Sequence, residues 1–228
     1  LFRSGLMPYA DFIDLNPPCI SILMSGLAIF GNCFALSMVP LFKASVFLFS
    51  IFSTALTGYF LVAADKHDAR LSKTSWAILF ALLLSPYFLS FGFGERDHLL
   101  TLGYLPYFFL RIAKAKFANI KVNAILSLLA GLLAGVAFCL KPQYILLMLV
   151  AEASRLKTAS LFVKAKDISI EVKGLLLSFA LYACYFLTLS PVAKENFAQF
   201  LMPLTVSDYT VYNVPYILSL DFFCHNGQ

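Results

Sequence analysis

The sequence predicts an all-α fold, a polytopic bundle of transmembrane helices, and three observations support this. Of the 228 residues, 61% are hydrophobic and only 13% are charged, whereas soluble domains carry about 25% charged residues. Several charge-free runs are long enough to cross a hydrocarbon core of about 30 Å as a helix. The apolar runs are also continuous rather than alternating, which is typical of helices and not of transmembrane strands.

The candidate spans follow one another along the chain: Ala44–Ala64, Ser75–Phe93, His98–Leu110, Val122–Leu140 and Gly174–Pro191, with Pro142–Ala153 as a short apolar return. Most of the 17 Lys and Arg residues lie in three connecting segments, 65–74, 111–121 and 155–173. Because positively charged loops tend to stay in the cytoplasm, we expect these segments inside. The turn at 94–97, Lys141 and the residues after 192 are then expected outside.

The apolar stretch Pro18–Leu41 precedes these spans and is interrupted by Gly26, Gly31-Asn32, Ser37 and Pro40. Its run before Gly31 is shorter than the roughly 20 residues that a span needs, which favours a re-entrant or interfacial segment. We therefore predict a jutting or re-entrant helix in the first outer loop, with residues 1–17 outside. A full crossing, which would place residues 1–17 in the cytoplasm, is the alternative.

The chain as a whole is expected to form one partial transmembrane domain. An outer loop with the jutting helix covers 1–43, transmembrane helices cover 44–191, and a truncated outer segment covers 192–228. The chain begins at Leu1 without a signal peptide and stops without a closing element, so we expect a piece of a longer protein.

Several classes of function are disfavoured by what the sequence lacks. The net charge of +5 comes from basic residues in short loops between apolar runs, which is typical of membrane orientation rather than nucleic-acid binding. The five cysteines show no metal or redox spacing and are expected to be small buried hydrophobic residues. The sequence also contains no P-loop, dinucleotide fingerprint, zinc-protease motif or serine-hydrolase elbow.

Polar residues gather first in the run from Gly5 to Pro18. Asp11 and Asp14 stand three residues apart and would share one face of a helix. One hypothesis is an acidic site at the membrane surface that supplies a general base or a metal ligand. The simpler interpretation is a solvated loop whose aspartate caps a helix.

The second cluster is the run Glu95-Arg96-Asp97-His98 between two apolar stretches. An arginine beside a helix N-terminus favours an anion such as phosphate. Asp97 and His98 have the chemistry for proton transfer or for a divalent ion. An ordinary polar turn is the alternative, although such a turn needs fewer charges.

The third feature is Lys141, which stands alone at an outer hairpin tip against the positive-inside tendency. It is a candidate for binding a lipid phosphate, and equally for reaching the headgroups with no specific role. In the outer tail, aromatic residues accompany Lys194, Glu195 and Asp208. For these aromatic residues, membrane anchoring is a better explanation than sugar stacking.

Taken together, these clusters resemble the integral-membrane GT-C glycosyltransferases. The run Gly5 to Pro18 is similar to their "G-x-x-P-Y-x-D-x-x-D/E-x-x-P-P" outer loop, which precedes a jutting helix. The run 93–98 resembles the "F-G-Q-R-E-H" turn of uncharacterised bacterial members, and Lys141-Pro142 resembles their "K-P" tip. The chain departs from the pattern at Glu95, where Gln is usual. The family's best-known acidic pair would also fall upstream of Leu1.

The resemblance implies a GT-C-like fold and transfer of a sugar from a polyprenyl-phosphate carrier to an acceptor on the outer side. By position it implies catalytic roles for Asp97, Asp11 and Asp14, and lipid-phosphate binding by Arg96 and Lys141. Supporting residues would be Glu95, His98, Tyr9 and Asn16. A divalent metal ion, where one is used, would be held by Asp14, Asp97 and His98.

The implied partners are the polyprenyl-phosphate-linked sugar donor, the lipid bilayer and a glycan, lipid or protein acceptor, with no nucleic acid. The implied location is a bacterial inner membrane, with the active site facing outward. The residues leave two other functions open. One is a transporter or flippase for a lipid-linked or anionic substrate, in which Arg96, Asp97 and Lys141 line the path. The other is a non-catalytic membrane subunit.

Overall fold

In a computed structural model of the whole chain, the structure describes residues 18–65, 77–81, 94–117, 120–146, 148–149 and 169–201. All regular secondary structure in these residues is helical, which confirms the predicted all-α class. The elements are α1 (Pro18–Cys33), α2 (Met38–Asp65), α4 (Arg96–Lys116), α5 (Ala124–Leu140), η2 (Pro142–Tyr144), α7 (Ile170–Thr188), α8 (Pro191–Asn196) and η3 (Phe197–Leu201). The candidate span at 75–93 lies largely outside the described residues, and the short apolar return at 142–153 lies partly outside them.

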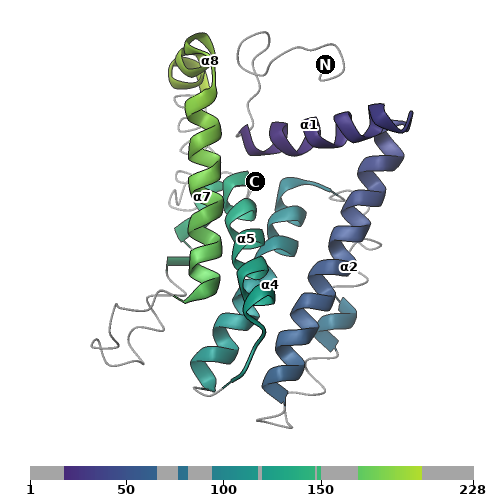
Figure 1. Cartoon of the computed structure of the whole chain (residues 1–228), viewed down its shortest axis with the longest axis vertical. Helices are drawn as coiled ribbons and strands as arrows, with labels where there is room; N and C mark the ends of the chain where they lie inside the picture. The colour runs from purple at the N-terminus through teal and green to yellow at the C-terminus, as the bar shows by residue number, and fades with distance from the viewer. Residues whose placement is uncertain are drawn as a thin grey trace, which may run out of the picture.

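The helices α2, α4, α5 and α7 run along the length of the molecule (Figure 1). The helix α1 lies across the end at which α2 begins, over α4 and α5, and α7 extends past it to α8. The helix α5 packs between α4 and α7, and α4 packs against α2. The N-terminus of α4 and the C-terminus of α5 meet at the end that α1 covers, here called the Lys141 end. The C-terminus of α4 and the N-terminus of α7 meet at the opposite end, here called the Glu171 end.

The stretch expected to form one jutting helix is divided between α1 and α2. The backbone N–H of Leu36 donates to the Gly31 carbonyl at 2.8 Å, and that of Ala35 donates to the Asn32 carbonyl at 3.4 Å. Ala35 has a φ of 50°. These two bonds and the left-handed residue form a Schellman motif, which ends α1 and turns the chain. The next helix therefore begins at Met38, earlier than the predicted Ala44.

The helix α4 is longer than the predicted span His98–Leu110 and carries an internal proline, Pro106. Proline has no N–H, so the carbonyl four residues earlier loses its helical donor. That carbonyl belongs to Leu102, and the Ser53 hydroxyl of α2 donates to it at 2.5 Å within the core. The freed acceptor is thus satisfied by a neighbouring helix, as an apolar environment requires.

Small residues set the contact between α5 and α7. A Cβ atom at Gly131 would overlap the Glu171 carbonyl oxygen, and one at Gly174 would overlap the Leu128 carbonyl oxygen. The Ser178 hydroxyl donates to the Leu132 carbonyl at 2.9 Å. Close backbone approach at small residues spaced four apart, with a hydroxyl bonded across the interface, is typical of helix pairs in membranes.

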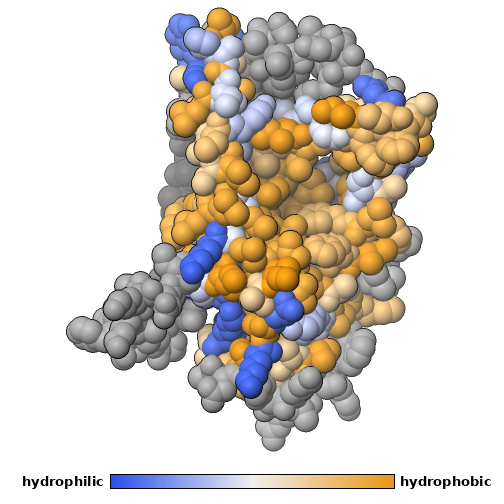
Figure 2. All heavy atoms as spheres, in the orientation of Figure 1, coloured by the Kyte–Doolittle hydropathy of each residue, from blue (hydrophilic) through white to orange (hydrophobic). Residues whose placement is uncertain are grey.

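The helix α2 exposes an apolar face and buries hydroxyl groups among the apolar residues of its other face. Ser53 and Thr57 are fully buried, while Leu48, Phe52 and Val62 are exposed. Figure 2 shows hydrophobic residues over the sides of the bundle and hydrophilic residues mainly toward its two ends. Among the described helices, Met38–Ala64 and Ile170–Thr188 are long and apolar enough to cross a membrane. Together these features indicate membrane association.

Candidate functional site

The turn that opens α4 depends on Gly94. Its φ of +78° lies in the left-handed region, and a Cβ atom there would come within 2.5 Å of the Phe42 ring. The backbone N–H of Gly94 donates to Nδ1 of His98 at 3.2 Å, and the N–H of Leu99 donates to the Glu95 carbonyl. These bonds fix the start of the helix and direct residues 95–97 toward the Lys141 end.

Lys141 and Asp97 meet across this end, where the antiparallel α4 and α5 bring their termini together. The Lys141 ammonium donates to Oδ1 of Asp97 at 2.5 Å. The lysine side chain is only 14% exposed and lies 5.6 Å from the centre of the Tyr144 ring, whereas the aspartate side chain is 56% exposed. Lys141 is thus held between two partners, while the aspartate carboxylate keeps access to water.

A cavity of about 420 Å³ opens beside this ion pair. It is lined by Ile20, Met24, Phe42, Gly94, Glu95, Arg96, Asp97 and Lys141. Four of the residues predicted from the sequence as site residues, two acidic and two basic, therefore share one cavity. Its remaining wall is supplied by α1 and the first turns of α2, which the sequence did not predict to contribute.

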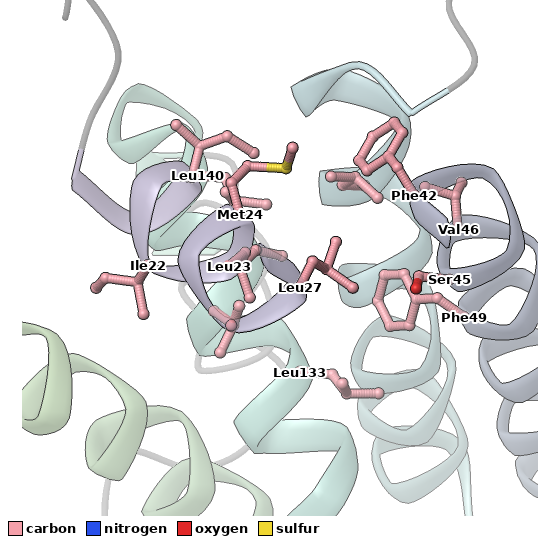
Figure 3. Close-up of a pocket in the computed structure, with 15 residues that line it drawn as sticks. Ile22, Leu23, Met24, Leu27, Phe42, Ser45, Val46, Phe49, Leu133 and Leu140 are labelled. Atoms are coloured by element: carbon pink, nitrogen blue, oxygen red, sulfur yellow. The ribbon is translucent and has the colours of Figure 1, made fainter. Parts of the chain in front are cut away.

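A second cavity, of about 550 Å³, lies beneath α1 between α2, α4 and α5, and its lining is almost entirely apolar (Figure 3). Its walls include Leu23, Leu27, Phe49, Leu133 and Leu140. Ile20, Met24 and Phe42 line both this cavity and the charged one. A charged compartment and an apolar compartment therefore lie next to each other and share walls.

The helix α1 is held over these cavities by a buried thiol. Cys19 donates to the Val136 carbonyl of α5 at 3.8 Å. Burial, with a smaller effect from the nearby Cys139 thiol, raises the pKa of Cys19 to about 12. A thiol with so high a pKa is a poor nucleophile at neutral pH, so Cys19 has a packing role.

Of the other predicted site residues, the structure describes only His98. His98 is buried and does not line the charged cavity, and its Nδ1 accepts the Gly94 N–H. Asp11, Asp14, Tyr9 and Asn16 lie outside the described residues. Within the described part of the chain, no group of three or more His, Cys, Asp or Glu residues is placed to hold a metal ion. The predicted metal ligands Asp14, Asp97 and His98 include one residue outside the described part of the chain, so the metal site stays a prediction.

The Glu171 end holds a charged cluster that sequence reasoning missed. The Glu171 side chain is 0% exposed and binds Arg111 at 2.9 Å and Lys114 at 2.7 Å. Arg111 also donates to the Ser169 hydroxyl at 3.0 Å. The two bases had been assigned to the connecting segment 111–121, but α4 continues through them. Their spacing of three residues would place both on one face of a helix, and this was the available signal.

Comparisons with known proteins found no matching family model, no similar curated protein and no similar solved structure. The functional argument therefore rests on the motifs and on the geometry of the two cavities.

Proposed function

We propose that this chain belongs to a membrane glycosyltransferase that takes a sugar from a polyprenyl-phosphate carrier. One observation carries the proposal: the charged cavity around Arg96 and Lys141 shares walls with the apolar cavity beneath α1. A polyprenyl phosphate has the same two parts, an anionic headgroup and an apolar chain. The chain would lie under α1, against residues such as Leu27 and Phe49, and the phosphate would lie in the charged cavity.

The residues of the charged cavity suit the chemistry of the transfer. Arg96 and Lys141 would bind the phosphate through charge-assisted hydrogen bonds and stabilise it as the leaving group. Asp97, whose carboxylate is exposed, would accept the proton of the acceptor hydroxyl as that oxygen attacks the sugar carbon. The bond from this carbon to the phosphate oxygen then breaks, and polyprenyl phosphate leaves. The proposal assigns no step to a metal ion.

The Lys141 end is proposed to face away from the cytoplasm, in a bacterial inner membrane. The support is the charge asymmetry. The helices α2 and α4 end, and α7 begins, at the Glu171 end, and in the sequence these helix ends adjoin the segments 65–74, 111–121 and 155–173, which are rich in Lys and Arg. Loops with this composition stay in the cytoplasm.

Sugar transfer in proteoliposomes tests the proposal. The full-length protein would be supplied with radiolabelled polyprenyl-phosphate-linked mannose, glucose or arabinose and a cell-envelope extract as acceptor. We expect labelled sugar to leave the lipid fraction with the wild-type protein and not with the Asp97→Asn or Arg96→Ala variants. Glu195→Gln, which removes an exposed carboxylate on α8 outside the cavity, is the control and should transfer normally.

Normal transfer by both cavity variants would remove Asp97 and Arg96 from the mechanism. Movement of the labelled lipid between leaflets without loss of its sugar would instead favour the transporter or flippase.

A further inference from the structure

The two partners of the Asp97–Lys141 ion pair differ in exposure to solvent. A structural brace, meaning a pair that only holds α4 and α5 together, does not require this difference. Lys141 is 14% exposed, follows the last residue of α5 and lies against the Tyr144 ring. Asp97 is 56% exposed and is reached from water. If the pair opens, the carboxylate regains its hydration, whereas the ammonium stays largely buried and needs another anion.

The charged cavity is also nearly balanced. Glu95 and Asp97 offset Arg96 and Lys141, so a phosphate that entered beside the intact pair would meet no net positive charge. A phosphate that takes the place of the Asp97 carboxylate at Lys141 would meet two cations opposed by one carboxylate. The exchange is therefore favourable for the phosphate and inexpensive for the exposed aspartate.

We propose that Asp97 is a displaceable stand-in for phosphate. Its carboxylate neutralises Lys141 until a lipid phosphate enters the cavity. The phosphate then forms an ion pair with Lys141 and displaces the carboxylate. This inference rests on the proposed function and adds a regulatory step to it. Asp97 becomes available as a base only when the donor is bound, which couples proton acceptance to donor binding.

The two residues should then have opposite effects on phosphate affinity. Removing the charge of Asp97 leaves Lys141 without its internal anion, so phosphate binds more tightly even though transfer is lost. Removing the charge of Lys141 weakens binding. A brace would behave differently, because loss of either partner would loosen the cavity and weaken binding.

Equilibrium binding of decyl phosphate, measured by calorimetry on the detergent-solubilised full-length protein, tests this inference. We expect Asp97→Asn to bind about tenfold more tightly than wild type and Lys141→Gln about tenfold more weakly. Glu95→Gln is the matched control, because it removes the same charge from the same cavity without touching Lys141. Its gain should be less than about threefold. In the Lys141→Gln background, Asp97→Asn should give no further gain.

Each outcome decides between the two proposals. If wild type binds decyl phosphate and Asp97→Asn binds no more tightly, or no more tightly than Glu95→Gln, the exchange is wrong and the lipid-phosphate site stands. If neither wild type nor Asp97→Asn binds it, the lipid-phosphate site is wrong and the exchange falls with it. Asp97→Ser, tested in parallel, is a second variant that lacks the Asp97 charge. The melting temperature of each variant separates a loss of binding from a loss of folding.

Discussion

Ion pairs join α4 to its neighbours at both ends of the bundle in the described part of the chain, and the two sites differ in how closed they are. At the Glu171 end, a carboxylate of α7 that is 0% exposed binds two bases of α4. At the Lys141 end, the carboxylate is 56% exposed and lines a cavity. The closed cluster fixes two helices relative to each other, whereas the open pair has room for an exchange of partners.

The largest effect on stability is expected when the carboxylate at each end is replaced by the matching amide. Glu171→Gln would replace a fully buried carboxylate and leave two partly buried bases without their anion, and we expect the free energy of unfolding to fall by about 3–5 kcal/mol. Asp97→Asn leaves one base, Lys141, without its anion beside an open cavity, and we expect a smaller loss of about 1–2 kcal/mol. Equilibrium unfolding in mixed detergent micelles measures both. Equal losses at the two ends would mean that the Lys141 end is also a structural brace.

The charged run at 95–97 was found from the sequence because its residues are consecutive. Glu95, Arg96 and Asp97 stand together between two apolar stretches, and the charge asymmetry of the loops placed Lys141 at the same end. The antiparallel contact of α4 and α5 then brings Lys141 to Asp97, 44 positions away in the chain. The pattern of spans was enough to predict this neighbourhood, but it was not enough to predict the two cavities or the walls that α1 supplies.

The Glu171 cluster was missed because no local pattern reports it. Arg111 and Lys114 were assigned to a basic loop by the positive-inside tendency, which describes the side of the membrane and not the structure of the segment. Their partner lies 57 positions beyond Lys114, in the first turn of α7. The close contact at Gly131 that brings this turn near α5 likewise depends on which helices pair. A sequence without an alignment does not specify that pairing.

A second prediction concerns the hydroxyl that supports α4 between the two ends. Ser53→Ala removes the donor to the Leu102 carbonyl, which Pro106 deprives of its helical partner. A buried acceptor left without a donor costs about 1–3 kcal/mol, and we expect the free energy of unfolding to fall by that amount. In a Pro106→Ala background the helical N–H returns, so the same substitution should cost clearly less.

The Ser53→Ala variant also tests whether the support of α4 by α2 affects binding at the Lys141 end. If α4 stays in place without the Ser53 hydrogen bond because Glu171 also holds it, the cavity at the Lys141 end keeps its shape. The affinity of this end for decyl phosphate should then be unchanged in Ser53→Ala. A changed affinity would show that the support of α4 reaches the cavity. Ser50→Ala, which removes a buried hydroxyl of α2 that lines neither cavity, is the control for the loss of a serine from α2.

The smallest expected effect lies at the corner that places α1 over the cavities. Ala35 has a φ of 50° where most Schellman motifs have glycine, and the left-handed conformation costs an L-residue roughly 1–2 kcal/mol. Ala35→Gly removes this strain but makes the unfolded chain more flexible, so we expect a net gain in the free energy of unfolding of at most about 1 kcal/mol. Equilibrium unfolding measures it, with Ala55→Gly as the control, because that substitution lies inside α2 and should cost about 0.5–1 kcal/mol. A loss of stability at both positions would mean that the α1–α2 corner does not adopt the left-handed turn, and α1 would then no longer be fixed as the cover of the Lys141 end.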